Sequence, residues 1–301
     1  EVDFYGKDGL KGAIDKLLDQ SRSDNFPFVP RDFVPNNNVN LRVAQIWWMG
    51  RFMLTENPLL EKMTLFWHDH FATSAQKVDK PGSMIQHINV LRENALGRFE
   101  DLLIAVSKDP AMIFWLDNQL NKKGKPNENF AREIMELFTV GIGHYTEQDV
   151  QEAARAFTGW GFGVNRVRQM ETLPGRAVQF VFDPRQHDEG VKSILGNKGP
   201  FSGDDVCGIL CGNPQTARHL VLKMWEWFAY AKPEDALIDR LAKRFRENGL
   251  KIAGLVRDIM ESEEFYSAKA ARKIYKNPID FVVPAVRALG IANSMRSVLQ
   301  D

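Results

Sequence analysis

Two histidines lie close together in a strongly apolar run, Leu65–Phe71. In a regular helix beginning at Pro58, His70 falls in the middle of the apolar face, and His68 falls on the opposite side beside Glu61. A buried imidazole needs hydrogen-bond partners, because leaving its nitrogen atoms unpaired costs stability. If the chain instead extends at this point, the two-residue period places both histidines on one side, where they could bind one metal ion. The sequence leaves both geometries open.

Carboxylates line one side of a second segment, residues 128–140. On a helix, its apolar side chains form one arc and its polar side chains the opposite arc. The polar arc consists of Glu128, Asn129, Arg132, Glu133 and Glu136. It is either a solvated face with weak Glu128–Arg132 and Arg132–Glu136 pairs or a carboxylate wall suited to metal binding or acid–base catalysis. Helix geometry alone favours the solvated face.

Arg92 lies inside the apolar arc of a predicted helix, residues 84–96. A guanidinium group keeps its charge, so in a buried position it needs a carboxylate or carbonyl partner. Glu133 or Glu136 would serve. Arg92 then either fastens two helices together as an ion pair or contacts a substrate.

His187 is the best third histidine for a site. It lies in a turn-rich loop, residues 183–190, together with Asp183 and Asp188. A turn-stabilising role is equally compatible with this position.

Composition excludes some classes of protein. The chain has 301 residues and a formal net charge of zero, which argues against a general nucleic-acid binder. No apolar run approaches the roughly 20 residues that span a bilayer, so no membrane span is predicted. The acidic start Glu1–Asp3 is not a signal peptide, so we expect mature or trimmed protein. Cys207 and Cys211 are interpreted as two core thiols.

Helical periods dominate the chain. An N-capping residue followed by proline marks helix starts at Pro58, Pro110, Pro214 and Pro278, and Thr146 with Asp149 marks another. Further helices are predicted over residues 9–20, 40–55, 84–96, 128–140, 203–211, 214–230, 234–247 and 251–260. We therefore predict an all-α fold, a compact multi-helix domain spanning residues 1–301.

Two segments interrupt this pattern. Residues 21–38, rich in proline and asparagine, predict an irregular connection over the surface. Residues 176–196 predict a β-hairpin insertion, in which the alternating segment 176–182 pairs with residues 191–195. His187 would then lie near the tip of the hairpin.

Three blocks of residues together resemble the bacterial family known as domain of unknown function 1800. The first covers residues 58–63 and 66–73, the second residues 127–133, 136, 137 and 141, and the third Phe182, His187, Asp188, Lys192 and Leu195–Gly196. The resemblance extends from about Gly9 to Gly290. It implies a bacterial, exported protein, periplasmic or extracellular, in a family with no assigned activity.

The resemblance also implies that separate segments contribute to a common pocket. The polar signature of the family falls on His68, His70, Arg92, Asn127, Glu128, Arg132, Glu133, Glu136, His187 and Asp188. These residues come from several predicted helices and one loop. Periodicity alone does not bring them together.

The lead hypothesis is a hydrolase that acts on an extracellular polymer, such as a polysaccharide, or on a small-molecule substrate. Its candidate cofactor is a divalent transition metal ion bound by His68, His70 and His187, with a carboxylate from Glu128 or Glu133. Another glutamate would be the general base, and Arg92 or Arg132 would stabilise developing negative charge. Candidate substrate contacts are Asn127, Asn129, Asp188 and Trp67.

Two alternatives need no metal ion. In the first, two carboxyl groups from Glu128, Glu133 and Glu136 hydrolyse a glycosidic bond as acid and base or nucleophile. In the second, the histidines, arginines and glutamates form a buried network that fixes the helices, and the protein is a secreted scaffold or binding module.

Overall fold

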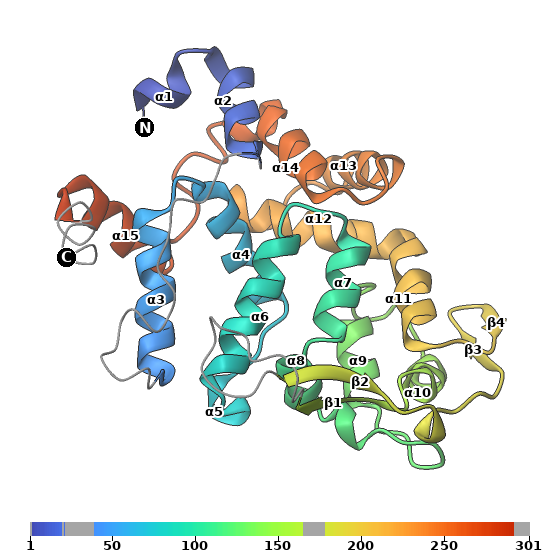
Figure 1. Cartoon of the computed structure of the whole chain (residues 1–301). Coiled ribbons are helices and arrows are strands. Elements are labelled where there is room, and N and C mark those ends of the chain that lie inside the picture. The colour runs from blue at the N-terminus through green and yellow to red at the C-terminus, as the bar shows by residue number, and fades with distance from the viewer. Residues whose placement is uncertain (1, 20, 22–38, 165–177, 292–301) are drawn as a thin grey trace.

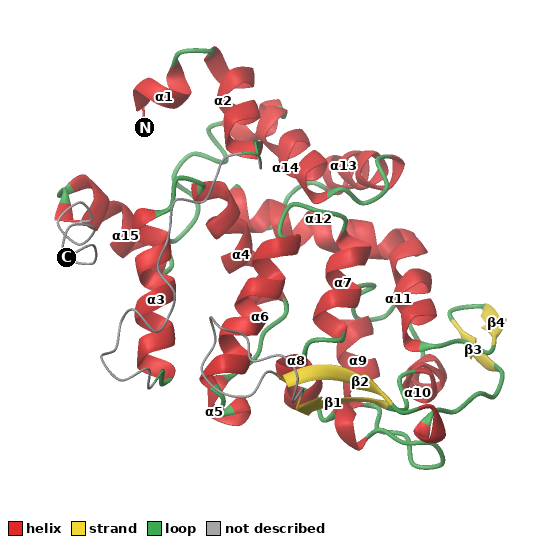
Figure 2. Ribbon diagram, viewed as in Figure 1, coloured by secondary structure: helices red, strands yellow, loops and turns green. Residues whose placement is uncertain are grey.

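The computed structural model of the chain describes residues 2–19, 21, 39–164 and 178–291. Within these residues it contains fifteen α-helices and two small two-stranded antiparallel sheets (Figure 1). Figure 2 shows how far helix predominates over strand. The prediction of a mainly helical fold is confirmed.

The helices lie on predicted segments except over residues 2–6, 75–78 and 99–107, where no helix was predicted. They are α1 (Val2–Gly6), α2 (Gly9–Leu18), α3 (Leu41–Leu54), α4 (Pro58–His70), α5 (Ala75–Val78), α6 (Pro81–Asn94), α7 (Phe99–Ser107), α8 (Pro110–Trp115), α9 (Asn129–Glu136), α10 (Glu147–Ala156), α11 (Gly203–Gly212), α12 (Pro214–Phe228), α13 (Asp235–Glu247), α14 (Ile252–Glu261) and α15 (Pro278–Ala288). The strands are β1 (Trp160–Val164), β2 (Val178–Phe182), β3 (Lys192–Ile194) and β4 (Asn197–Gly199).

The predicted start signals mark real helix ends. Helices α4, α8, α12 and α15 each begin at their proline. Helix α10 begins with a capping box: the Thr146 hydroxyl accepts the backbone N–H of Asp149, and the Asp149 carboxylate accepts the backbone N–H of Thr146. Local sequence therefore sets where these helices begin.

Helix α4 is buried on two sides. A hydrophobic cluster that includes residues of α4, α6 and α7 to α14 covers its apolar face, and Trp67 is completely buried there. Helices α3 and α6 lie against the other side, so Glu61 and Thr64 are buried as well. The helix stays regular as far as His70, so the extended geometry for His68 and His70 does not occur.

The predicted hairpin is wrong in its pairing. Strand β2 pairs antiparallel with the upstream strand β1, and Phe182 lies opposite Trp160. Strand β3 pairs with β4, and the turn between them is Leu195–Gly196, whose residues both have positive φ, as a two-residue hairpin turn requires. An alternating pattern identifies an extended segment but does not identify its partner strand.

The position of His187 also differs from the prediction. It directly follows a short 3-10 helix, Pro184–Gln186, and is buried. The prediction for residues 21–38 falls on a segment of which residues 22–38 lie outside the described part of the chain. That all 301 residues form one domain stays a prediction.

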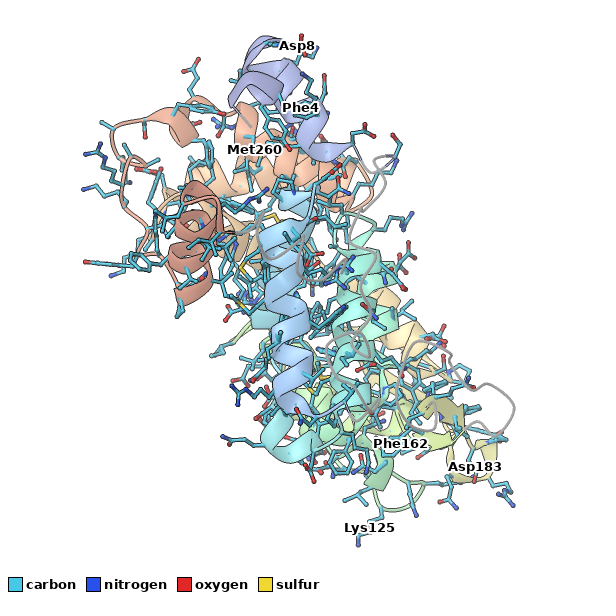
Figure 3. All side chains as sticks on the ribbon, turned by 60° about the vertical axis from the view of Figure 1, so that its left-hand side comes forward. Phe4, Asp8, Lys125, Phe162, Asp183 and Met260 are labelled. Atoms are coloured by element: carbon cyan, nitrogen blue, oxygen red, sulfur yellow. The ribbon has the colours of Figure 1, made fainter. Side chains whose placement is uncertain are left out.

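The molecule is elongated in Figure 3. Phe4, Asp8 and Met260 lie toward one end, and Lys125, Phe162 and Asp183 lie toward the other. Among the described residues, no helix is both long enough and apolar enough to cross a membrane.

Candidate active site

Helix α9 carries the predicted carboxylates on its outer side. As predicted, Phe130, Ala131, Ile134 and Met135 are buried. The helix ends before the apolar pattern does, because Gly141 turns the chain with a φ of 83° and donates its N–H to the Met135 carbonyl. Leu137 is turned outward as a result and is 44% exposed.

Three side chains from two other helices bind the carbonyl groups just beyond the end of α9. His70 of α4 donates Nε2–H to the Phe138 carbonyl over 3.1 Å, and His219 of α12 donates Nε2–H to the Leu137 carbonyl over 3.1 Å. Lys223, one turn further along α12, reaches the Leu137 carbonyl and His70 Nδ1, each over 3.4 Å. These contacts join α4, α9 and α12 at one point.

Burial sets the charge of these groups. It lowers the pKa of His70 well below the usual 6.5, and the charges of Lys223 and His219 lower it further. It also lowers the pKa of Lys223, which the charge of Asp69 opposes. At neutral pH His70 is therefore a neutral imidazole that gives its one proton to the Phe138 carbonyl and can accept from Lys223.

Glu133 and Glu136 lie one turn apart at this end of α9. Tyr145 donates its hydroxyl to the Glu136 carboxylate. Burial, together with the bond to Glu136, raises the pKa of Tyr145 to about 12. The half-buried Glu133 carboxyl has no hydrogen bond or ion pair within the described part of the chain. Its pKa lies above the ordinary 4.5, because burial and the charge of Glu136 outweigh the opposing charge of Arg132.

This arrangement can do acid–base chemistry. The pKa of the Glu133 carboxyl is raised, and the Glu136 carboxylate accepts a hydrogen bond from the Tyr145 hydroxyl. Two carboxyl groups in different environments can serve as an acid and a base. The Lys223 ammonium group and the Nε2–H group of His219 lie close by, at the Leu137 carbonyl. These groups could stabilise negative charge on a substrate.

Three predicted residues lie at the opposite end of α9. Asn127 accepts the backbone N–H of Asn129, and Asn129 donates its side-chain amide to the Leu116 carbonyl. Asn127 and Glu128 also line a surface hollow of about 610 Å³. Asn127 and Asn129 thus shape the start of the helix, about two turns away from Glu136.

Arg132 does not pair with Glu136 as predicted. It binds Glu147 at 2.7 Å and Glu128 at 3.1 Å. Glu147 lies beyond the turn that follows α9, so the period of a single helix could not predict this pair. The hydrogen bond to Glu147 raises the pKa of Arg132, which is consistent with a guanidinium group engaged in structural pairs.

The predicted partner of Arg92 is wrong. Its Nε and Nη2 atoms donate to the two carboxylate oxygens of Glu61 over 2.6 and 3.0 Å, and Arg51 donates to the same carboxylate over 3.1 Å. Burial alone would raise the pKa of Glu61, but hydrogen bonds and charge from both arginines bring it below its ordinary value. Arg92 therefore joins α6 to α4 and does not contact Glu133 or Glu136.

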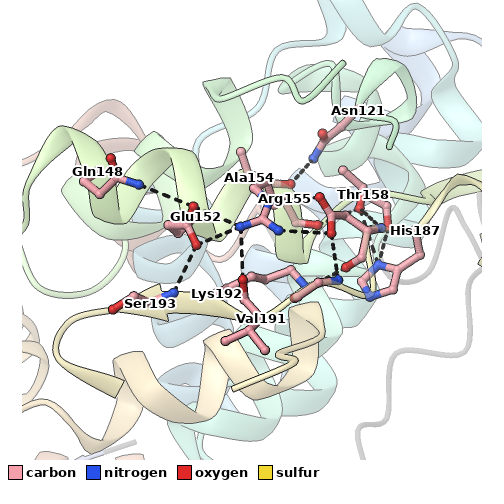
Figure 4. A network of polar contacts seen from close by, with 12 residues as sticks. Asn121, Gln148, Glu152, Ala154, Arg155, Thr158, His187, Val191, Lys192 and Ser193 are labelled. Carbon is pink, nitrogen blue, oxygen red and sulfur yellow. Dashed lines mark hydrogen bonds and ion pairs between the residues drawn. The ribbon is translucent and has the colours of Figure 1, made fainter. Parts of the chain in front are cut away.

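His187 and Asp188 belong to a separate polar network (Figure 4). Arg155 of α10 binds the two carboxylate oxygens of Asp188 at 2.9 and 3.1 Å. Lys192, almost completely buried, donates to two backbone carbonyls of the same loop. His187 donates Nδ1–H to the Thr158 carbonyl over 2.9 Å. This network attaches the loop to α10 and does not include Glu133 or Glu136.

The three histidines proposed as metal ligands do not form one site. His70 has a partner at each ring nitrogen, and His187 is bound to Thr158. The ring of His68 lies against His87 and Trp48 instead. Among the described residues, no three His, Cys, Asp or Glu side chains are arranged to hold a metal ion. The residues therefore do not fit the predicted divalent metal site.

Trp67 is not available to a substrate. It is completely buried, and its indole nitrogen donates to the Ala95 carbonyl over 2.9 Å. The aromatic residue of the histidine motif is therefore a core residue, and its predicted role as a substrate contact is wrong.

Comparison with known proteins settles the family. The model of the family described as protein of unknown function (DUF1800) matches residues 1–301. The chain belongs to this family. No curated protein and no solved structure matches it. Membership of DUF1800 assigns no activity, so the function has to be argued from the site.

Three residues at the site of this DUF1800 protein were not predicted from its sequence: Tyr145, His219 and Lys223. His219 and Lys223 are four residues apart on one helix, so they share a face, and this spacing is a usable signal. Tyr145 lies beyond the turn at Gly141, and no local pattern predicts that it folds back onto Glu136. Tertiary contacts supply that information.

Proposed function

We propose that this DUF1800 protein is a hydrolase that needs no metal ion and uses Glu133 as its general acid. Glu136 is the second carboxylate, oriented by Tyr145. The end of α9, where α4 and α12 meet it, is the proposed reaction centre.

The observation that carries the proposal is the state of the Glu133 carboxyl. It is half-buried, has no partner among the described residues, and lies beside a second carboxylate that does have one. Most other carboxylates of the family signature are neutralised by arginine: Glu128 by Arg132, and Asp188 by Arg155. A carboxyl group left without a counter-charge is free to exchange a proton with a substrate.

The chemistry follows from the two carboxyl groups. Glu133 gives its proton to the leaving oxygen as the bond from that oxygen to the substrate carbon breaks. Glu136 either accepts a proton from the attacking water or attacks the carbon directly, in which case water later releases the product. For a glycosidic bond, a carboxyl separation of about 5 Å predicts retention and about 6.5–9.5 Å predicts inversion.

We propose an extracellular polymer as the substrate, with a polysaccharide as the first class to test. Export and the polymer rest on the family resemblance. Lys223 places positive charge near the reaction centre, which favours an anionic polymer over a neutral one.

Hydrolysis of a panel of soluble anionic and neutral polysaccharides, followed by the release of reducing ends, tests the proposal. We expect Glu133→Gln to lower the rate by about 10²- to 10⁴-fold, as loss of a general acid does. Glu128→Gln is the matched control on the same helix and should keep the wild-type rate. The rate should fall as the pH rises above the pKa of Glu133, because the acid loses its proton.

Two further readouts complete the test. Addition of EDTA should leave the rate unchanged. Glu133→Gln should not lower the unfolding midpoint at pH 7, since folding disfavours the ionised carboxyl that the substitution removes. Equal rates for Glu133→Gln and wild type, or loss of activity with EDTA, would overturn the proposal.

One observation favours a second candidate, the secreted scaffold or binding module. Arg92, Arg132, His187 and Asp188 are all bound within the protein. If wild-type protein binds one of the polymers in a pull-down but releases no reducing ends from any of them, this second candidate replaces the first.

A further inference from the structure

Unpartnered buried polar atoms gather on the side of α4 that faces away from the proposed reaction centre. Among the described residues, eight buried side-chain nitrogen or oxygen atoms have no hydrogen-bond partner. Four of them are Trp48 Nε1, His68 Nδ1, His87 Nε2 and Asp109 Oδ1, and each of these side chains contacts the next one in space. Buried polar atoms normally find partners, so such a group calls for an explanation, and a bound ion is one that can be tested.

The rings of this group form a chain across three helices. The Trp48 ring of α3 meets the His68 ring of α4 edge to face at 5.0 Å between centroids. The His68 ring in turn lies 6.0 Å from the His87 ring of α6. His87 is completely buried, whereas His68 is half-buried, so the group lies one side chain below the surface.

Asp109 fixes the orientation of His87. Its Oδ2 atom accepts Nδ1–H of His87 over 2.9 Å and also accepts the N–H groups of Ala111 and Met112 at the start of α8. With its proton on Nδ1, His87 carries a lone pair on Nε2. A carboxylate behind a histidine is the usual second shell of a metal ligand, because it sets the tautomer and raises the basicity of the ring.

His68 is also suited to donate a lone pair. Its Nδ1 atom is buried and has no hydrogen-bond partner among the described residues, which leaves it available as a ligand. Two metal–nitrogen bonds of about 2.0 Å fit within the 6.0 Å between the two ring centroids.

We propose that His68 Nδ1 and His87 Nε2 bind one monovalent copper ion, Cu(I), between α4 and α6. This site is distinct from the divalent site predicted with His68, His70 and His187, and it does not rest on the proposed hydrolase activity.

The number of ligands selects the ion. Zinc takes four ligands, and among the described residues no three His, Cys, Asp or Glu side chains converge on one point. Cu(I) has a filled d shell and is satisfied by two nitrogen ligands, and imidazole suits copper. The desolvation free energy of burying an ion grows with the square of its charge, so burying a monovalent ion here costs less free energy than burying a divalent one. The Asp109 carboxylate offsets that single charge.

Anaerobic titration of the full chain with Cu(I), in competition with bicinchoninate, tests the proposal. The buried thiols of Cys207 and Cys211 could compete for copper, so the titration is made in a Cys207→Ala, Cys211→Ala background. We expect one equivalent to bind. Asp109→Asn should weaken binding by about 10- to 100-fold, as loss of a second-shell partner does, and His68→Ala or His87→Ala should weaken it further. His144→Ala, at an exposed histidine, is the matched control and should bind as before.

The X-ray absorption spectrum of the copper-loaded Cys207→Ala, Cys211→Ala protein gives a second test, which does not require the His68, His87 or Asp109 variants to fold. We expect two nitrogen neighbours and no sulfur. No bound copper, equal affinity in the His68→Ala and His144→Ala variants, or sulfur neighbours in this spectrum would each overturn the proposal.

Discussion

The cost of a buried charge depends on its partner, and Glu61 shows this most clearly. The Glu61 carboxylate is 1% exposed and is the shared partner of Arg92 and Arg51. The sequence correctly predicts that Arg92 needs a carboxylate but cannot say which one. Glu61 lies on the side of α4 that the apolar pattern assigns to solvent, and only the packing of α3 and α6 makes it buried.

We predict that Glu61→Ala lowers the free energy of unfolding by about 3–5 kcal/mol, because it leaves the buried Arg92 without its counter-charge. Urea denaturation measures the change. Glu128→Ala is the matched control: it removes one partner from the more exposed Arg132, which keeps Glu147, and should cost no more than about 1 kcal/mol. Similar losses of unfolding free energy in both variants would contradict the claim that burial makes the Glu61 pair more important for stability than the exposed pair.

At the scale of elements, ion pairs fasten a loop to a helix. The loop between β2 and β3 is bound to α10 through Arg155 and Asp188, and Glu152 accepts the backbone N–H of Ser193 from the same side (Figure 4). Period-two alternation identified the strands on both sides of the loop. It could not show that each strand pairs outside the predicted hairpin, since backbone pairing is non-local.

This fastening predicts a pH dependence. The bond to Arg155 holds the pKa of Asp188 at about 2, below the ordinary 3.8, so the folded state binds fewer protons than the unfolded state in that range. The stabilising contribution of the Asp188–Arg155 pair to the folded state is fully present above pH 3.8 and is lost as the pH falls toward 2. We expect the protection of the backbone amides of residues 188–195 against hydrogen exchange to fall over this pH range in wild-type protein.

Arg155→Ala should already show the fast exchange at pH 7, while amides of α12 stay protected in both proteins. Unchanged exchange in the loop after this substitution would contradict the assigned role of the pair.

At the scale of the whole molecule, the sequence predicts helices and strands better than it predicts the tertiary contacts between them. Helix starts and buried faces follow from proline, capping residues and the helical period, so α4, α9, α10 and α12 were predictable. The site was predictable only in part. Glu133, Glu136 and His70 do lie on elements that meet at the end of α9, but Lys223 and Tyr145 reach it from segments that no local pattern connects.

The same limit explains why the family signature did not mark one pocket. Its polar residues are divided among the end of α9, the Glu61 pair and the loop held by Arg155. Apart from Glu133 and His68, most of these residues have hydrogen-bond or ion-pair partners within the protein, and the groups serve different contacts between elements. In a helical fold of this size, motif residues that stand out in sequence include both structural ion pairs and candidate catalytic groups, and only their partners distinguish them.

The central claim is that folding raises the pKa of the Glu133 carboxyl. The most direct measurement is a carbon-13 NMR titration of the side-chain carboxyl groups, with the Glu133 resonance assigned by its loss in Glu133→Gln. The account predicts that Glu133 titrates above the ordinary value of 4.5, because burial and Glu136 disfavour its ionised form. Titration at or below 4.5 would contradict the assignment of Glu133 as the general acid.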